Sequence, residues 1–302
     1  MSGIRPRAFD RRWLRALALG VFVSACAGGA DGPRQQMSTP AGPTAPPPTV
    51  NTPPSITSLT TSSPRAEADA EIGATATVED AETPIDQLAY QWSASPASGV
   101  FTGSGRDVKW RAPKGQTTPD LYTLTLLVIE TYTSGGQPAQ NKTSKSVQVH
   151  YNDSPAEITR IGMRFLTELF PTFTVSPKDA VQDFSDNCRG KSDELSDVTA
   201  NRANFHILTG TFSGITIDFN GDKTFADSRG RCEFEDIPTN PTNPNFGKRE
   251  RVSGTCQLTA VYENWKWFLC DSHFLPPYGT TIESLRGRVP GRIILSEPPR
   301  LR

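Results

Sequence analysis

The sequence predicts two folded domains, an all-β sandwich followed by an α+β domain whose N-terminal helices pack on a curved antiparallel sheet. A length of 302 residues suggests two domains. The 26 prolines and 24 glycines are too many for an all-helical bundle. Period-two alternation fills short runs in the middle of the chain, whereas the second half begins with helix-start signals and then returns to strand patterns.

The N-terminus has the pattern of an export signal. Residues 1–15 carry five arginines against one aspartate, and the apolar run 16–23 that follows is shorter than the roughly 20 residues of a membrane span. The run ends in Val23-Ser24-Ala25-Cys26, which resembles the lipobox of bacterial lipoproteins. The resemblance implies cleavage after residue 25 and acylation of Cys26, which then holds the protein on the membrane. Ala27 after this cysteine implies the outer membrane of a Gram-negative cell envelope.

Residues 26–54 are predicted to be a disordered tether. Eight prolines lie among Gly, Ser, Thr and Gln in this stretch, without apolar periodicity. Beyond residue 25 the chain has 26 basic and 31 acidic residues. This acidic balance disfavours general nucleic-acid binding and leaves membrane attachment to the lipid on Cys26.

Residues 55–152 are predicted to form the sandwich. Turn residues separate runs of alternating side chains at 74–78, 88–92, 107–110, 122–128 and 146–150. The opening 51–57, the strand Tyr90-Gln91-Trp92 and the Asp120-Leu121-Tyr122 entry to the longest strand resemble bacterial immunoglobulin-like and PKD-like domains. The resemblance implies that Trp92 is a core residue and that Tyr122 forms a corner hydrogen bond.

Residues 153–275 are predicted to form the α+β domain. Helix starts are expected at Ser154-Pro155-Ala156-Glu157, with Ser154 as N-cap, at Ser176-Pro177 and at Ser192-Asp193-Glu194-Leu195. Strands are expected at 211–219, 224–235, 249–262 and 265–274.

This order of elements, with its aromatic hairpin Tyr262-Glu263-Asn264-Trp265-Lys266-Trp267, resembles the NTF2-like fold over about residues 155–275. That fold is shared by acid/base enzymes and by non-catalytic pocket domains. Residues 276–302 form a Pro/Arg-rich tail that either adds one strand at 292–295 or drapes loosely.

The four cysteines beyond Cys26 all lie in the second domain, where an exported chain is expected to form disulfides. Cys232 and Cys256 lie on successive predicted strands and can face each other, which leaves Cys188 to pair with Cys270. We favour this one of the three pairings. A zinc site is disfavoured because the sequence has no Cys-x-x-Cys spacing.

Three residues are the candidates for catalysis. Asp271 and His273 lie two apart on the last strong strand and are expected to share one face with Trp265, Trp267 and Leu269. If that face lines a cavity, Asp271 can orient His273 for acid/base work, and Tyr262 is a third residue to test. The simpler interpretation of Asp271 and His273 is a hydrogen-bonding feature at a strand end.

A metal site is not expected. Asp218, Asn220 and Asp222 are weak calcium candidates, because the stretch 218–224 resembles the first half of a calcium loop. Such a loop needs Gly at its sixth position and an acid at its twelfth, and this sequence has Lys223 and Arg229 there. A hairpin turn at Asn220-Gly221 explains the same residues.

The sequence therefore favours a non-enzymatic, membrane-anchored lipoprotein that acts in binding, adhesion or envelope interaction. Its partner is expected to be an unidentified protein or glycan, and no cofactor is expected. An NTF2-like isomerase or dehydratase acting on a small apolar substrate is the alternative. A purely structural role in envelope assembly is a third possibility.

Overall fold

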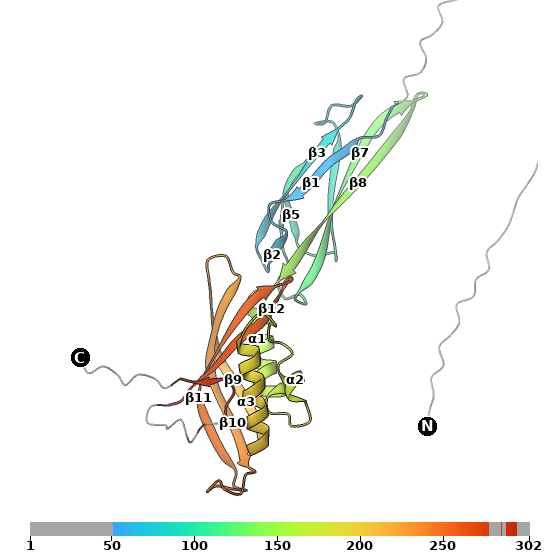
Figure 1. Ribbon diagram of the computed structural model, residues 1–302. Coiled ribbons are helices and arrows are strands. Elements are labelled where there is room, and N and C mark those ends of the chain that lie inside the picture. Colours follow the sequence, from blue (N-terminus) through green and yellow to red (C-terminus); the bar gives the residue numbers. More distant parts are fainter. Residues whose placement is uncertain (1–50, 278–284, 286–287, 295–302) are drawn as a thin grey trace, which may run out of the picture. The chain divides into compact units, whose positions relative to one another are not determined.

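The computed structural model describes residues 51–277, 285 and 288–294. The predicted signal, Cys26 and nearly all of the predicted tether lie outside these residues. The described residues belong to one compact unit, Val50–Arg302. They are mostly β, with several sheets and few helices (Figure 1). No helix among the described residues is long and apolar enough to cross a membrane.

Residues 55–152 form two four-stranded sheets, with orders β1-β3-β6-β5 and β2-β8-β7-β4. The strands are β1 (Ser55–Thr61), β2 (Arg65–Glu67), β3 (Glu71–Glu79), β4 (Ala89–Ser95), β5 (Val100–Ser104), β6 (Asp107–Arg111), β7 (Asp120–Ser134) and β8 (Gln137–Asn152). Neighbouring strands are antiparallel except β2, which pairs in parallel with β8. The strictly alternating burial along β3 and β6 matches the period-two pattern of their sequences.

The sandwich contains two clusters of buried side chains, one around Trp110 and one against which Trp92 packs. Trp110 is fully buried, and its ring centroid lies 5.2 Å from that of Tyr122. Trp92 is only half-buried and donates its indole N–H to the carbonyl oxygen of Gly105 at 3.0 Å. The Tyr122 hydroxyl shares a hydrogen bond of 3.1 Å with the Ser98 hydroxyl. Trp92 therefore packs against the core, as predicted, and Trp110 on β6 is the more deeply buried tryptophan.

Residues 154–204 form a helical layer that precedes a third sheet. Its elements are α1 (Ser154–Met163), the π-helix η1 (Arg164–Leu169), α2 (Pro177–Ala180) and α3 (Gly190–Asn204). The α1 cap differs from the prediction, since Asp153 is the N-cap and its side chain accepts the backbone N–H of Ala156 at 3.2 Å. Ser154, the predicted cap, is instead a buried first helical residue.

Replacing Asp153 by Ala is expected to lower the free energy of unfolding by about 1 kcal/mol, because the N–H of Ala156 loses its acceptor. Urea unfolding measures this change. Asp86, an exposed acid on a surface turn, provides the matched control, and Asp86→Ala is expected to have little effect. Equal stability of Asp153→Ala and wild type would show that the cap contributes nothing.

The helices cover one face of a curved sheet with order β13-β12-β11-β10-β9 (Figure 1). Its strands are β9 (Phe205–Phe219), β10 (Phe225–Pro238), β11 (Glu250–Glu263), β12 (Lys266–Leu275) and β13 (Arg292–Ile293). The first four are antiparallel and correspond to the four predicted strands, with β9 starting six residues earlier than expected. β13 pairs in parallel with β12 and lies within the predicted extra strand at 292–295.

Candidate functional site

Aromatic side chains fill the space between the helices and the concave face of this sheet. Phe165, Phe170, Phe184, Phe234 and Phe274 are all at most 2% exposed. The ring centroids of Phe165 and Phe184 lie 4.9 Å apart, and those of Phe170 and Phe234 lie 5.4 Å apart, in edge-to-face arrangements typical of packed cores. The space between the helices and the sheet is therefore a hydrophobic core.

Asp271 and His273 do not share a face with Trp267 and Leu269. The pairing of β12 with β11 shifts at Cys270, because Leu269 lies opposite Ala260 and Asp271 lies opposite Thr259. Trp267 and Leu269 are buried before this bulge, whereas Ser272 and Phe274 are buried after it. An extra residue in one strand inverts the alternation beyond it. The expectation of one common face was therefore wrong.

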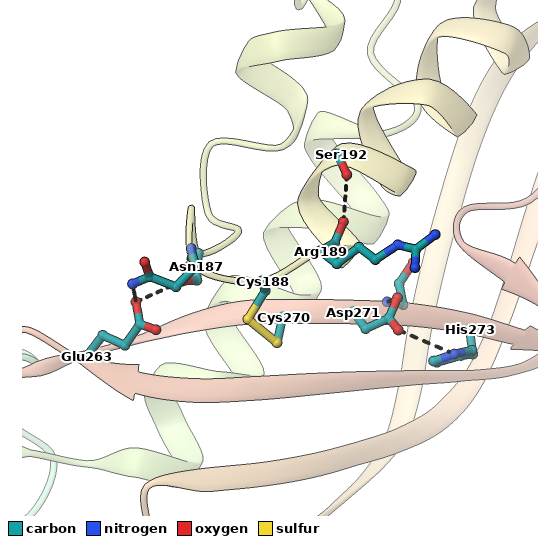
Figure 2. Close-up of a disulfide and its surroundings, with 10 residues drawn as sticks. Asn187, Cys188, Arg189, Ser192, Glu263, Cys270, Asp271 and His273 are labelled. Carbon is teal, nitrogen blue, oxygen red and sulfur yellow. Dashed lines mark hydrogen bonds and ion pairs between the residues drawn. A yellow bond between two sulfur atoms is a disulfide. The ribbon is translucent and has the colours of Figure 1, made fainter.

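The two residues nevertheless contact each other. Asp271 Oδ2 lies 3.5 Å from His273 Nε2, and Figure 2 shows the pair beside the N-terminal end of α3. His273 Nδ1 is buried and has no hydrogen-bond partner within the described part of the chain. At this distance the carboxylate can orient the imidazole ring. Both an acid/base pair and a hydrogen bond at a strand end have this geometry.

Tyr262 lies apart from this pair, towards the β11–β12 turn. Its hydroxyl donates to Asn152 Oδ1 at 2.5 Å, and the Arg65 guanidinium lies 3.6 Å from its ring centroid. Burial raises the pKa of Tyr262 to about 12, so the hydroxyl keeps its proton at neutral pH. The structure therefore does not bring Tyr262 together with Asp271 and His273.

Glu157 and Asn152 form a buried polar network next to Tyr262. Glu157 accepts the backbone N–H of Trp267 at 3.0 Å and the side-chain amide of Asn152 at 3.2 Å. Burial raises the pKa of Glu157, while these donors act in the opposite direction. The carboxylate oxygens of Glu157 already accept hydrogen bonds from other groups of the protein. We therefore interpret this network as structural.

The stretch with the weak calcium candidates is the turn between β9 and β10. Asn220 Oδ1 accepts the backbone N–H groups of Thr224 and Phe225, both at 2.9 Å. Asp222 Oδ1 accepts the hydroxyl of Thr224 at 2.6 Å, and hydrogen bonds from Thr224 lower the pKa of Asp222. These side-chain oxygens therefore stabilise the turn. Among the described residues, no three His, Cys, Asp or Glu side chains are grouped so that they could hold a metal ion.

Both favoured disulfides are present. Cys188 pairs with Cys270, which joins the segment before α3 to β12 (Figure 2), and Cys232 pairs with Cys256 between β10 and β11. The first disulfide links the helical layer to the strand that carries Asp271. The second lies in the core, where Cys232 and Cys256 are at most 1% exposed.

A pocket of about 810 Å³ lies beside α3, at the edge of the sheet formed by β12 and β13. Its lining includes four acids, Asp193, Glu194, Asp197 and Asp271, and the guanidinium of Arg292. Phe205, Val289 and Ile293 provide apolar surface, and asparagines after β10 complete the rim. The volume lies within the usual range of small-molecule sites.

Glu194 is the most unusual residue of this pocket. It is 2% exposed, and its Oε2 accepts a hydrogen bond from the Ser272 hydroxyl. The backbone N–H of Gly291 also acts on this carboxyl, and its Oε1 is buried. Burial, together with the nearby Asp197 and Asp271, raises the pKa of Glu194 to about 8. The carboxyl group is therefore largely protonated at neutral pH.

Sequence reasoning missed this pocket although it included Asp271. The stretch 192–195 was interpreted only as a helix start. A signal was present, because Asp193 and Asp197 are four residues apart and therefore lie on the same side of a helix. The partners of these acids come from segments about 75 to 100 residues further along the chain, and no local pattern connects them.

No protein-family model matches the chain, and no curated protein matches it. Among solved structures, an NTF2-like superfamily protein from Salmonella enterica serovar Typhimurium is similar at 12% identity, with 42% of this chain and 93% of that chain covered and a TM-score of 0.33. A protein from Kribbella flavida is similar at 15% identity, with 41% and 91% covered and the same TM-score. A protein from Mycobacterium tuberculosis is similar at 9% identity, with 42% and 82% covered, again with a TM-score of 0.33.

Proposed function

We propose that the protein is an exported lipoprotein that binds a ligand without chemical turnover, through an NTF2-like C-terminal domain carried on an immunoglobulin-like sandwich. The observation that carries this proposal is that side chains fill the space between the helices and the concave face of the sheet. An NTF2-like enzyme needs an open cone for its substrate, whereas here fully buried phenylalanines such as Phe165 and Phe234 occupy that space. The pocket beside α3 borders this core, since Phe205 and Val289 belong to both, and it offers a binding site.

The order of strands supports the immunoglobulin-like assignment. Sheet β1-β3-β6-β5 and the neighbours β8-β7-β4 correspond to the two sheets of an immunoglobulin constant-type domain, with β2 as an added strand beside β8. Tyr122 also lies near the start of the second-last strand, as the corner tyrosine of that fold does. Such a domain suits a spacer or an adhesion module in the cell envelope.

The order of elements in the second domain supports the NTF2-like assignment. Three helical segments precede four long antiparallel strands, and α1 and α3 pack against the same sheet. The N-terminal sequence supports export and anchoring, since an arginine-rich segment, a short apolar run and Val23-Ser24-Ala25-Cys26 follow one another in the order of a lipoprotein signal.

A second candidate function, acid/base catalysis, is favoured by one observation. Asp271 lines the pocket and contacts His273, so the pair lies beside a space large enough for a small molecule. Tyr262 does not belong to this candidate, because its hydroxyl is bonded to Asn152. Unchanged metabolite turnover in Asp271→Ala and His273→Ala variants would exclude it.

The proposal predicts a defined chemical form for the mature protein. Intact mass of the full chain from the membrane fraction of its own host is expected to begin at Cys26 with attached acyl chains. The Cys26→Ser variant is expected to lack the acyl chains and to leave the membrane fraction. An unacylated wild-type chain in the soluble fraction would overturn the anchoring.

A further inference from the structure

The loop 239–249, which joins β10 to β11, lies at the surface of the protein. It makes several of its hydrogen bonds within itself; the backbone N–H of Phe246, for example, donates to the carbonyl oxygen of Asn243 at 3.0 Å. The side chain of Phe246 is 52% exposed. A segment with few buried contacts opens locally at a small free-energy cost, and exposed loops are preferred sites of proteolytic cleavage.

This loop carries two adjacent basic residues, Lys248 and Arg249. They are the only such pair in the sequence after Arg12. Both side chains are exposed, and Arg249 forms an ion pair of 3.3 Å with Glu235 at the surface. The peptide bond between them precedes Glu250, the first residue of β11, so it lies outside the paired strands. The acidic specificity pocket of a trypsin-like serine protease recognises an exposed basic side chain of this kind.

Both disulfides cross this point of the chain. Cys188 and Cys232 precede Lys248, whereas their partners Cys270 and Cys256 follow it. The strands β10 and β11, on either side of the loop, also pair over most of their length. A cut in the loop therefore leaves the two parts of the chain joined by covalent bonds and by hydrogen bonds.

The same loop forms one wall of the pocket beside α3. Asn240, Thr242 and Asn243 line the pocket, and the side-chain amide of Asn240 donates to Asn204 Oδ1 at 3.4 Å. The wall is held at both ends, by β10 before residue 239 and by β11 after residue 249. A cut after Lys248 releases one of these ends, which gives the wall more conformational freedom and changes access to the pocket.

We propose that the peptide bond between Lys248 and Arg249 is a processing site for a trypsin-like serine protease, and that processing gives a disulfide-linked two-chain protein with a loosened pocket wall. Hydrolysis adds one water molecule across the bond and leaves a carboxylate on Lys248 and an ammonium group on Arg249. The inference rests on the proposed export, which exposes the loop to proteases outside the cytoplasm and lets the disulfides form.

Limited digestion of the full chain in detergent with trypsin, followed by electrophoresis and mass measurement, tests the site. We expect the first cut after Lys248, with one band before reduction and two fragments after it. Replacing both residues, Lys248→Gln with Arg249→Gln, is expected to slow this cut by at least about tenfold, because the recognised side chain is lost. Lys114→Gln, at an exposed lysine between β6 and β7, is the matched control and should be cut like wild type. A first cut elsewhere, or fragments that separate without reductant, would overturn the proposal.

Two further measurements test processing in the host and its effect on the pocket. Protein recovered from the membrane fraction of its own host is expected to yield, after reduction, a fragment that begins at Arg249. Hydrogen–deuterium exchange at residues 239–247 is expected to be faster in the cut protein than in the uncut protein, with exchange in β3 unchanged.

Uncut protein alone in the host would refute the processing, and unchanged exchange in the loop would refute its effect on the pocket wall. The intact-mass measurement tests anchoring separately. Acylated, uncut protein refutes only the processing site, and unacylated two-chain protein refutes only the lipid anchor.

Discussion

Loss of the Cys188–Cys270 disulfide is expected to lower the protein's free energy of unfolding by roughly 4 kcal/mol. The two cysteines are 82 residues apart, so the disulfide strongly restricts the unfolded chain. It also holds the segment before α3 against β12, where Ser272 and Asp271 meet the helix. The effect is a large share of the roughly 5–15 kcal/mol that stabilises a typical domain.

Urea unfolding of the Cys188→Ala/Cys270→Ala double variant under oxidising conditions measures this loss. The Cys232→Ala/Cys256→Ala variant is the companion. Its sulfurs are 24 residues apart, and chain entropy alone predicts a loss of roughly 3 kcal/mol for it. In a variant that lacks all four of these cysteines, the free energy of unfolding should not change when a reductant is added. Stability equal to wild type in the first variant would contradict a structural role for the disulfide.

The protein is expected to lose stability as pH rises from about 4.5 to 8, because of Glu194. The pKa of its carboxyl is 4.5 in the unfolded chain and about 8 in the folded one. Within this window the unfolded chain has released the proton while the folded chain retains it, so each increase in pH favours unfolding. At about 1.4 kcal/mol per pKa unit, the contribution approaches roughly 5 kcal/mol.

Glu194→Gln removes this contribution while preserving the shape of the side chain. The difference in free energy of unfolding between this variant and wild type, measured at several pH values, should grow in favour of the variant up to about pH 8 and then remain constant. Glu168→Gln, at an exposed acid on η1, is the matched control and should follow the wild-type curve. A difference that does not change with pH would show that Glu194 is not held protonated in the folded state.

The sequence predicted the classes of element well because side-chain periodicity is local. Alternation at 74–78 and 107–110 corresponds to β3 and β6, and the helix signals before residue 205 correspond to α1, α2 and α3. The cysteine pairing also followed from local order, since β10 and β11 are adjacent strands joined by one loop. These inferences required only neighbouring elements to pack together.

The inferences that failed depended on single residues. One extra residue at Cys270 inverts the faces of β12, and no alternation pattern shows where a bulge will occur. Which tryptophan is buried more deeply, Trp110 or Trp92, also depends on how the two sheets meet. The pocket is assembled from α3, β12 and β13, so its acids became neighbours only through tertiary packing.

Both disulfides lie in the second half of the chain. The sandwich, residues 55–152, contains no cysteine, whereas the sheet that follows depends on two crosslinks. A cytoplasm that keeps thiols reduced therefore removes both crosslinks from the sheet β9–β13 and breaks no covalent bond in residues 55–152. Residues 55–152 and the sheet β9–β13 therefore differ in their redox requirement.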